Sequence, residues 1–106
     1  MDDDVVARWK AQVEKFPDNE LPRFSLAKAY IDAGAYEEAI ETLKDAITIK
    51  SDWMAAKIML ARALIHLQRY DEARPMLEES RNLAHQLGHE SPIQEIDEMI
   101  EQLPKD

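Results

Sequence analysis

Apolar and small residues recur along this chain with a period of 34 positions. Residues 20–53 and 54–87 overlay without a gap, and eight positions of the overlay hold the same residue. Within each copy the apolar positions have helical spacing, so the pattern predicts a pair of helices that stacks on copies of itself. The identical pairs are Leu26 and Leu60, Ala27 and Ala61, Ala29 and Ala63, Ile31 and Ile65, Tyr36 and Tyr70, Glu38 and Glu72, Ala39 and Ala73, and Leu43 and Leu77.

The breaks between the apolar stretches predict an all-α protein. The only two glycines, Gly34 and Gly88, fall where helices should end. No run of alternating β-branched residues predicts a strand. We expect helices over about 4–16, 20–33, 36–50, 53–66 and 70–87, and a last one beginning near Ser91.

Short polar residues precede three of these expected helices. Such residues can accept hydrogen bonds from the free backbone N–H groups of a first helical turn. Ser91, Pro92 and Gln94 also have the order of a capping box with a first-turn proline. We therefore expect caps at Asp18 or Asn19, at Ser51 and Asp52, and at Ser91.

Composition limits the chain to one domain and narrows its partners. The formal net charge is −9, and the six acids and one lysine of residues 90–106 make the C-terminal end especially acidic. Phosphate-rich partners require a basic surface, so we expect neither nucleic acid nor an anionic membrane. No apolar stretch approaches the roughly 20 residues of a membrane span. The absence of cysteine agrees with a cytoplasmic location.

The overlaid residues resemble the tetratricopeptide repeat. The first copy carries the motif almost throughout, whereas the second has Gln68 in place of the glycine and Ser80 in place of the last alanine. The resemblance implies a short right-handed α-solenoid of about two and a half repeats with a C-terminal capping helix. Its parts would be 1–19 as a half-repeat helix, 20–53 and 54–87 as repeats, and 91–104 as the cap. The residues that carry the motif are Leu26, Ala27, Tyr30, Gly34, Tyr36, Ala39, Leu43 and Ala46.

The resemblance also implies a binding surface. In tetratricopeptide proteins one face of the first helix of each repeat lines a concave groove. At 100° per residue, that face is turned away from the buried leucines and alanines of the same helix. Carried over position by position, the groove residues are Leu21, Phe24, Ser25, Lys28, Ile31, Asp32, Ala55, Ile58, Met59, Arg62, Ile65 and His66.

Lys28 and Arg62 occupy equivalent positions in this expected groove. One interpretation is that they bind a carboxylate or acidic side chains of a partner through charge-assisted hydrogen bonds. The alternative is that they pair with Asp32, Glu20 or another surface acid. The groove differs from the carboxylate clamp of chaperone-binding tetratricopeptide domains, because Phe24 replaces a lysine and Met59 an asparagine.

These observations favour a non-catalytic adaptor that binds a peptide or helix of another protein. The rival interpretation is a homo-oligomer whose groove is buried by a second copy, because an exposed apolar surface does not distinguish self from other proteins. We expect no enzyme activity and no cofactor, since neither a phosphate loop nor an activated nucleophile is evident.

Two histidine arrangements suggest other chemistry. His85 and His89 have i, i+4 spacing beside Glu90, but Gly88 should end the helix between them, so we expect no metal site. His66 lies one turn from Arg62 on the groove face. We interpret it as an ordinary exposed histidine rather than a pH sensor.

Overall fold

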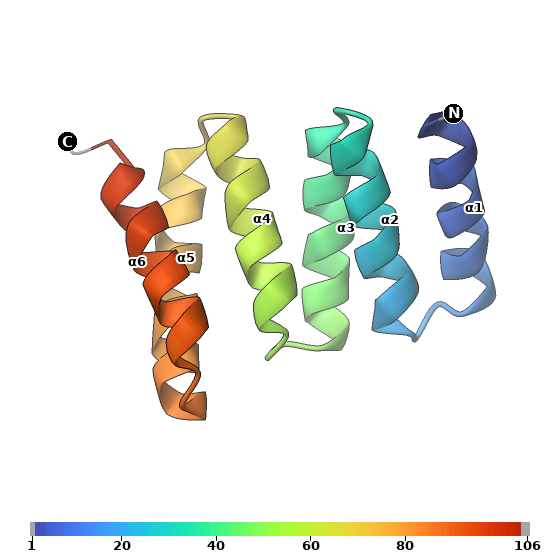
Figure 1. Cartoon of the computed structure of the whole chain (residues 1–106). Coiled ribbons are helices and arrows are strands. Elements are labelled where there is room, and N and C mark those ends of the chain that lie inside the picture. Colours follow the sequence, from blue (N-terminus) through green and yellow to red (C-terminus); the bar gives the residue numbers. More distant parts are fainter. Residues whose placement is uncertain (1, 105–106) are drawn as a thin grey trace.

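The computed structural model describes residues 2–104, which form six α-helices and no strand (Figure 1). Each helix packs mainly on its neighbours in sequence, so the helices stand in a row with α1 at one end and α6 at the other. The radius of gyration of 14.1 Å exceeds the roughly 13 Å of a compact domain of this size. The expected all-α solenoid is confirmed. The helices are α1 (Asp2–Lys15), α2 (Glu20–Asp32), α3 (Tyr36–Ile49), α4 (Met54–His66), α5 (Tyr70–Leu87) and α6 (Glu90–Gln102).

The helices form two layers. In Figure 1, α2, α4 and α6 lie in front, and α3 and α5 lie behind them. Four repeated alanines are completely buried where the layers meet, and a larger side chain at these positions would hold the helix axes apart. These alanines are Ala27, Ala39, Ala61 and Ala73.

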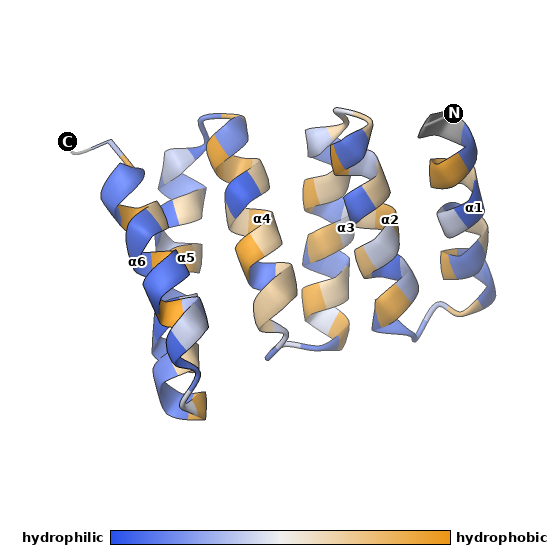
Figure 2. Cartoon of the chain, in the orientation of Figure 1, coloured by the Kyte–Doolittle hydropathy of each residue, from blue (hydrophilic) through white to orange (hydrophobic). Residues whose placement is uncertain are grey.

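The core consists of two adjoining clusters. The first joins α2 to α5 through residues such as Ile40, Leu43 and Leu60. The second joins α4 and α5 to α6 through Leu77 and Ile96. Figure 2 shows the corresponding pattern, with apolar positions interleaved with polar ones on every helix and a largely hydrophilic outer side on α6. Helix α4 contributes to both clusters and therefore links the two halves of the chain.

Several predicted helix ends are confirmed. The Asn19 side chain accepts a hydrogen bond from the Leu21 backbone N–H at 3.0 Å, as expected of a cap. Gly34 and Gly88 have positive φ angles of 79° and 72°, which permit the reversal after α2 and the left-handed end of α5. Gln68 adopts the same conformation with φ of 60°, although it carries a side chain.

Two predicted caps are wrong. Ser51 and Asp52 lie in a turn, and Trp53 precedes α4 without a side-chain capping bond. The last helix begins at Glu90, with His89 before it, so Ser91 lies inside the first turn instead of capping it. Gln94 is directed along the helix towards Glu98, at 3.5 Å, and forms no capping box. The capping helix thus covers Glu90–Gln102 rather than 91–104.

Candidate functional site

All twelve predicted groove residues lie on α2 and α4, two of the three front helices of the row. Eight of them line two adjoining hollows, which share Phe24 as a common wall. The structure therefore brings most of the predicted set onto one surface. The eight residues are Phe24, Ser25, Lys28, Asp32, Ala55, Ile58, Met59 and Arg62.

The larger of the two, here called the central hollow, lies between α2, α4 and α6. Its volume is about 460 Å³, and most of its lining is apolar. Arg62 and Glu95 supply its charged groups. A concave apolar surface with few polar groups is typical of a site that binds another molecule. The lining residues are Phe24, Met54, Ala55, Ile58, Met59, Arg62, Pro92 and Glu95.

The second, here called the N-terminal hollow, lies between α1 and α2. Its volume is about 410 Å³. It combines two aromatic rings, Trp9 and Phe24, with one cation and one acid, Lys28 and Asp32. The remaining lining residues are Val5, Ser25 and Ala29.

Phe24 is held in place by an aromatic neighbour. Its ring stacks on Trp53, with centroids 4.8 Å apart and planes 28° from parallel. The Lys50 ammonium lies 5.8 Å from the centroid of the Trp53 ring, and Trp53 directly precedes α4. Stacking of this geometry stabilises a pair beyond its burial alone. The wall between the two hollows is therefore a fixed ring rather than a free side chain.

The two equivalent cations have different surroundings. Arg62 forms an ion pair and hydrogen bond with Glu95, which reaches across from α6. Lys28 is exposed, and no residue within 2–104 forms an ion pair with it. The alternative of a surface-acid partner thus holds for Arg62, although the acid is neither Asp32 nor Glu20. Lys28 remains available to a ligand.

Four predicted groove residues lie outside these two hollows. Leu21 is 60% exposed at the start of α2. Ile31 is partly buried, and Ile65 packs against both core clusters. The imidazole of His66 stacks on Tyr36, the first residue of α3, with centroids 3.9 Å apart. Residues carried over from the tetratricopeptide groove thus include both residues that line the hollows and residues that pack against the core.

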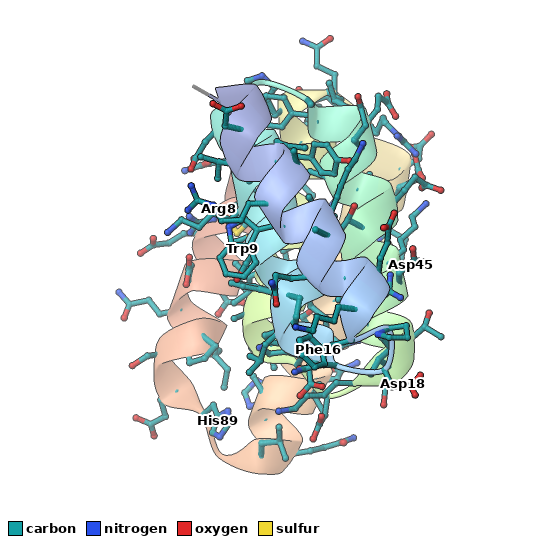
Figure 3. All side chains as sticks on the ribbon, turned by 90° about the vertical axis from the view of Figure 1, so that its right-hand side faces the viewer. Arg8, Trp9, Phe16, Asp18, Asp45 and His89 are labelled. Carbon is teal, nitrogen blue, oxygen red and sulfur yellow. The ribbon has the colours of Figure 1, made fainter. Side chains whose placement is uncertain are left out.

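Sequence reasoning missed six residues of this surface. Val5 and Trp9 of α1 both line the N-terminal hollow. Figure 3 shows Trp9 on the flank of α1 towards α6, whereas Asp45 lies on the opposite side. Pro92 follows Ile58 by one further period of 34, so the repeat itself contained the signal for it. The other three are Ala29, Met54 and Glu95.

The histidine pair is separated by a chain reversal. His85 lies in α5, Gly88 ends that helix in a left-handed conformation, and His89 precedes α6. Among the side chains of residues 4–104, no three from His, Cys, Asp or Glu are grouped so that they could hold a metal ion. In the same part of the chain, no helix is both long and apolar enough to cross a membrane.

Residues 9–80 match the sequence model of a family described as anaphase-promoting complex, cyclosome, subunit 3, and this match spans about two-thirds of the chain. The chain belongs to this family, whose repeats are of the tetratricopeptide type. The resemblance inferred from Leu26, Ala27, Gly34 and Tyr36 is therefore confirmed. A search of curated proteins gave no match.

Solved structures share the tetratricopeptide fold. The TPR2B domain of yeast Sti1, solved in a complex with pHsp70, has a TM-score of 0.83 at 23% identity, over 91% of this chain and 77% of that domain. The TPR2AB domains of yeast Sti1, in a complex with pHSP90, give 0.86 at 22% identity, over 94% of this chain and 39% of the other. A protein from Bordetella parapertussis gives 0.80 at 23% identity, over 93% and 86% of the two chains. At these identities the likeness concerns the fold.

Proposed function

We propose that this chain is a non-catalytic protein-interaction module. It binds an extended or helical segment of another protein along the surface formed by the central and N-terminal hollows. The observation that carries the proposal is the position of Phe24. It is fixed by Trp53 and forms one continuous wall between two hollows on the front helices. Rigid aromatic anchors at the centre of a concave surface are typical of strong binding positions.

Two further findings support a protein partner. The family is built from tetratricopeptide-type repeats, and two structural neighbours are domains solved in complexes with pHsp70 or pHSP90. In this chain, however, Phe24 and Met59 stand where chaperone-binding domains have clamp residues. The partner should therefore present apolar side chains to the central hollow instead of relying on a carboxylate clamp.

The charged groups suggest where an acidic side chain of the partner would bind. Lys28 lies in the N-terminal hollow without an ion pair among the described residues. Arg62 is already neutralised by Glu95, so a partner acid would have to displace that carboxylate. We therefore expect Lys28 to contribute more than Arg62 to acidic recognition. The gain should be modest, about 1 kcal/mol or less, because Lys28 is exposed.

Selection from a displayed library of random peptides tests the proposal. Peptides enriched on the immobilised protein would be synthesised and their Kd values measured by calorimetry. Ala55→Glu places a charge in the central hollow and should weaken binding at least about tenfold. Ala11→Glu is the matched control, because Ala11 is also an exposed helical alanine but belongs to α1 and lines neither hollow.

The outcomes separate the groove from other surfaces. Equal affinity of the wild type and Ala55→Glu for every selected peptide would place binding elsewhere. Lys28→Gln should weaken the binding of peptides that contain an acidic residue and leave the binding of neutral peptides unchanged. Sedimentation over a concentration series examines the rival homo-oligomer: self-association abolished by Ala55→Glu would mean that a second copy occupies the groove.

A further inference from the structure

Lys57 is the one buried charged residue among those that the structure describes. It is 5% exposed and lies in the first turn of α4. Lysine is rarely buried to this degree without a partner, because removing an ammonium group from water is costly. Its surroundings therefore need a physical explanation.

The Lys57 ammonium forms an ion pair but no hydrogen bond with the described residues. Its nearest acid is Glu79 of α5, with 3.7 Å between Nζ and Oε1, and the Glu79 side chain is 69% exposed. This separation permits attraction but exceeds a normal hydrogen bond. Among residues 2–104, none accepts a hydrogen bond from Lys57 Nζ, although an ammonium carries three donors.

A separate hollow of about 410 Å³ adjoins this lysine. Asn82 and Gln86 line it from α5, one turn and two turns beyond Glu79, and Ser51 lines it from the turn before α4. The side chains of Ser51, Asn82 and Gln86 form no hydrogen bond with other described residues. Four side chains that can donate hydrogen bonds therefore line this hollow, the buried Lys57 and the exposed Ser51, Asn82 and Gln86.

This site is distinct from the groove. It shares no lining residue with the central or N-terminal hollow, and it involves α3 and α5, which form the back layer in Figure 1. Lys57 precedes Ile58 by one residue, so the two side chains leave α4 about 100° apart. Its occupant need not compete with a partner in the groove.

We propose that the Lys57 hollow binds a carboxylate group attached to a short aliphatic chain. The Lys57 ammonium would provide the charge, and the amides of Asn82 and Gln86 and the hydroxyl of Ser51 would donate hydrogen bonds to the two oxygens. Ile47 and Leu83 complete the lining and provide apolar surface for the aliphatic part. The exposed Glu79 carboxylate would turn into water as the ligand enters.

The charge balance favours a monoanion. One ammonium faces the hollow, Glu79 contributes an opposing charge at its edge, and the chain as a whole carries −9. A carboxylate is balanced by Lys57 alone, whereas a phosphate group would bring close to two charges at pH 7. The same carboxylate chemistry is provided by a small aliphatic acid and by the C-terminus of a polypeptide.

Nuclear magnetic resonance titration of the whole chain tests this site. The probes are N-acetyl-leucine and its neutral amide, N-acetyl-leucinamide, which differ only in the carboxylate. The acid should cause saturable shifts at the signals of Ser51, Lys57, Asn82 and Gln86, and the amide should cause none. Sodium hexanoate and a tetrapeptide ending in leucine with a free carboxyl then distinguish a small acid from a chain terminus by which of them binds more tightly.

Three variants assign any binding to this hollow. Lys57→Met keeps the length of the buried side chain and should weaken the binding of N-acetyl-leucine at least about tenfold. Glu79→Gln removes the competing acid from an exposed position and should strengthen binding about two- to fivefold. Lys44→Met is the control, since Lys44 is an exposed lysine of α3 that does not line the hollow, and it should leave the affinity unchanged.

Several results would overturn the proposal. They are absence of saturable shifts, equal shifts with the acid and the amide, and unchanged binding by folded Lys57→Met. If Lys57→Met proves unfolded, Glu79→Gln decides instead, because an affinity equal to that of the wild type would mean that the carboxylate does not bind beside Lys57.

Discussion

At the scale of single residues, the two copies of the repeat form the same turn with different residues. Gly34 and Gln68 are equivalent under the period of 34, and both have positive φ, at 79° and 60°. Only glycine adopts this left-handed conformation without a steric penalty, which for other residues is about 1–2 kcal/mol. The fold therefore imposes the turn on Gln68 through the packing of the helices on either side.

We expect Gln68→Gly to stabilise the protein by up to about 1 kcal/mol. The relieved backbone strain exceeds the extra entropy that glycine gives to the unfolded chain. Denaturant unfolding measures the change. Gly34→Ala is the reciprocal control and should cost about 1 kcal/mol through its backbone alone, because a Cβ there would meet nothing within 4 Å. A loss of stability in Gln68→Gly would mean that the Gln68 side chain contributes contacts that outweigh the strain.

At the scale of helices and turns, a charged cluster fastens the start of α5 to α3. The Arg69 guanidinium donates hydrogen bonds to Glu72 at 2.7 Å and to Glu37 of α3 at 3.0 Å. The hydrogen bond from Arg69 is the main reason that the pKa of the Glu72 carboxyl lies below its ordinary value, and the charges of Arg69 and Lys44 add to it. Desolvation acts in the opposite direction.

This pKa shift predicts a pH dependence of stability. Because the pKa of Glu72 is lower in the folded state, its contribution is fully present above the ordinary pKa of glutamate and is lost as the pH falls through the folded pKa. Glu72→Gln should therefore be less stable than the wild type at pH 7, and the difference should shrink towards pH 3. Urea midpoints at several pH values measure it. Glu78→Gln, an exposed neighbour on α5, is the control; an equal effect of both variants would exclude a specific role for Arg69.

The positions of the helices were more predictable from the sequence than the residues that cap them. Periodic leucines and alanines define a helix because packing requires them, and the breaks at Gly34 and Gly88 follow from backbone freedom. Ser51 and Ser91 are good capping residues that do not cap. Trp53 stacks on Phe24 and precedes α4 in extended conformation, while α6 starts directly after the reversal at Gly88 and His89. Tertiary packing overrode local preference at both places.

The candidate site was predictable where the period continues. Ile58 and Met59 could be located by analogy with Phe24 and Ser25, because repeats place equivalent residues on the same face. The pairing of Arg62 with Glu95 could not, because α5 has 18 residues where α3 has 14, and the rotation of α6 is set by how it packs on that longer helix. A contact between helices outside the repeat depends on geometry that spacing does not determine.

At the scale of the whole molecule, the two ends of the row differ. Ile96 and Met99 of α6, and Leu103 directly after it, pack into the second core cluster, and α6 presents mostly polar residues to solvent, as a capping helix should. At the other end, Val5 and Phe16 are 38% and 46% exposed. The C-terminal end is therefore sealed by apolar packing, and that packing also positions Pro92 and Glu95 at the edge of the central hollow.

We expect Ile96→Ala to cost about 2–5 kcal/mol, because it leaves a cavity beneath α6 where the side chain is completely buried. Ile49→Ala is the matched control, because the Ile49 side chain is 39% exposed. We expect this variant to lose about 1 kcal/mol of stability or less, well below the loss at a buried isoleucine. Denaturant unfolding compares the two variants. Since α6 packs on α5, loosening it should also weaken the Arg62–Glu95 pair and shift the signals of both residues. An equal loss of unfolding free energy in the two variants would mean that the packing of α6 contributes little to stability. The side of the central hollow that Pro92 forms would then be mobile.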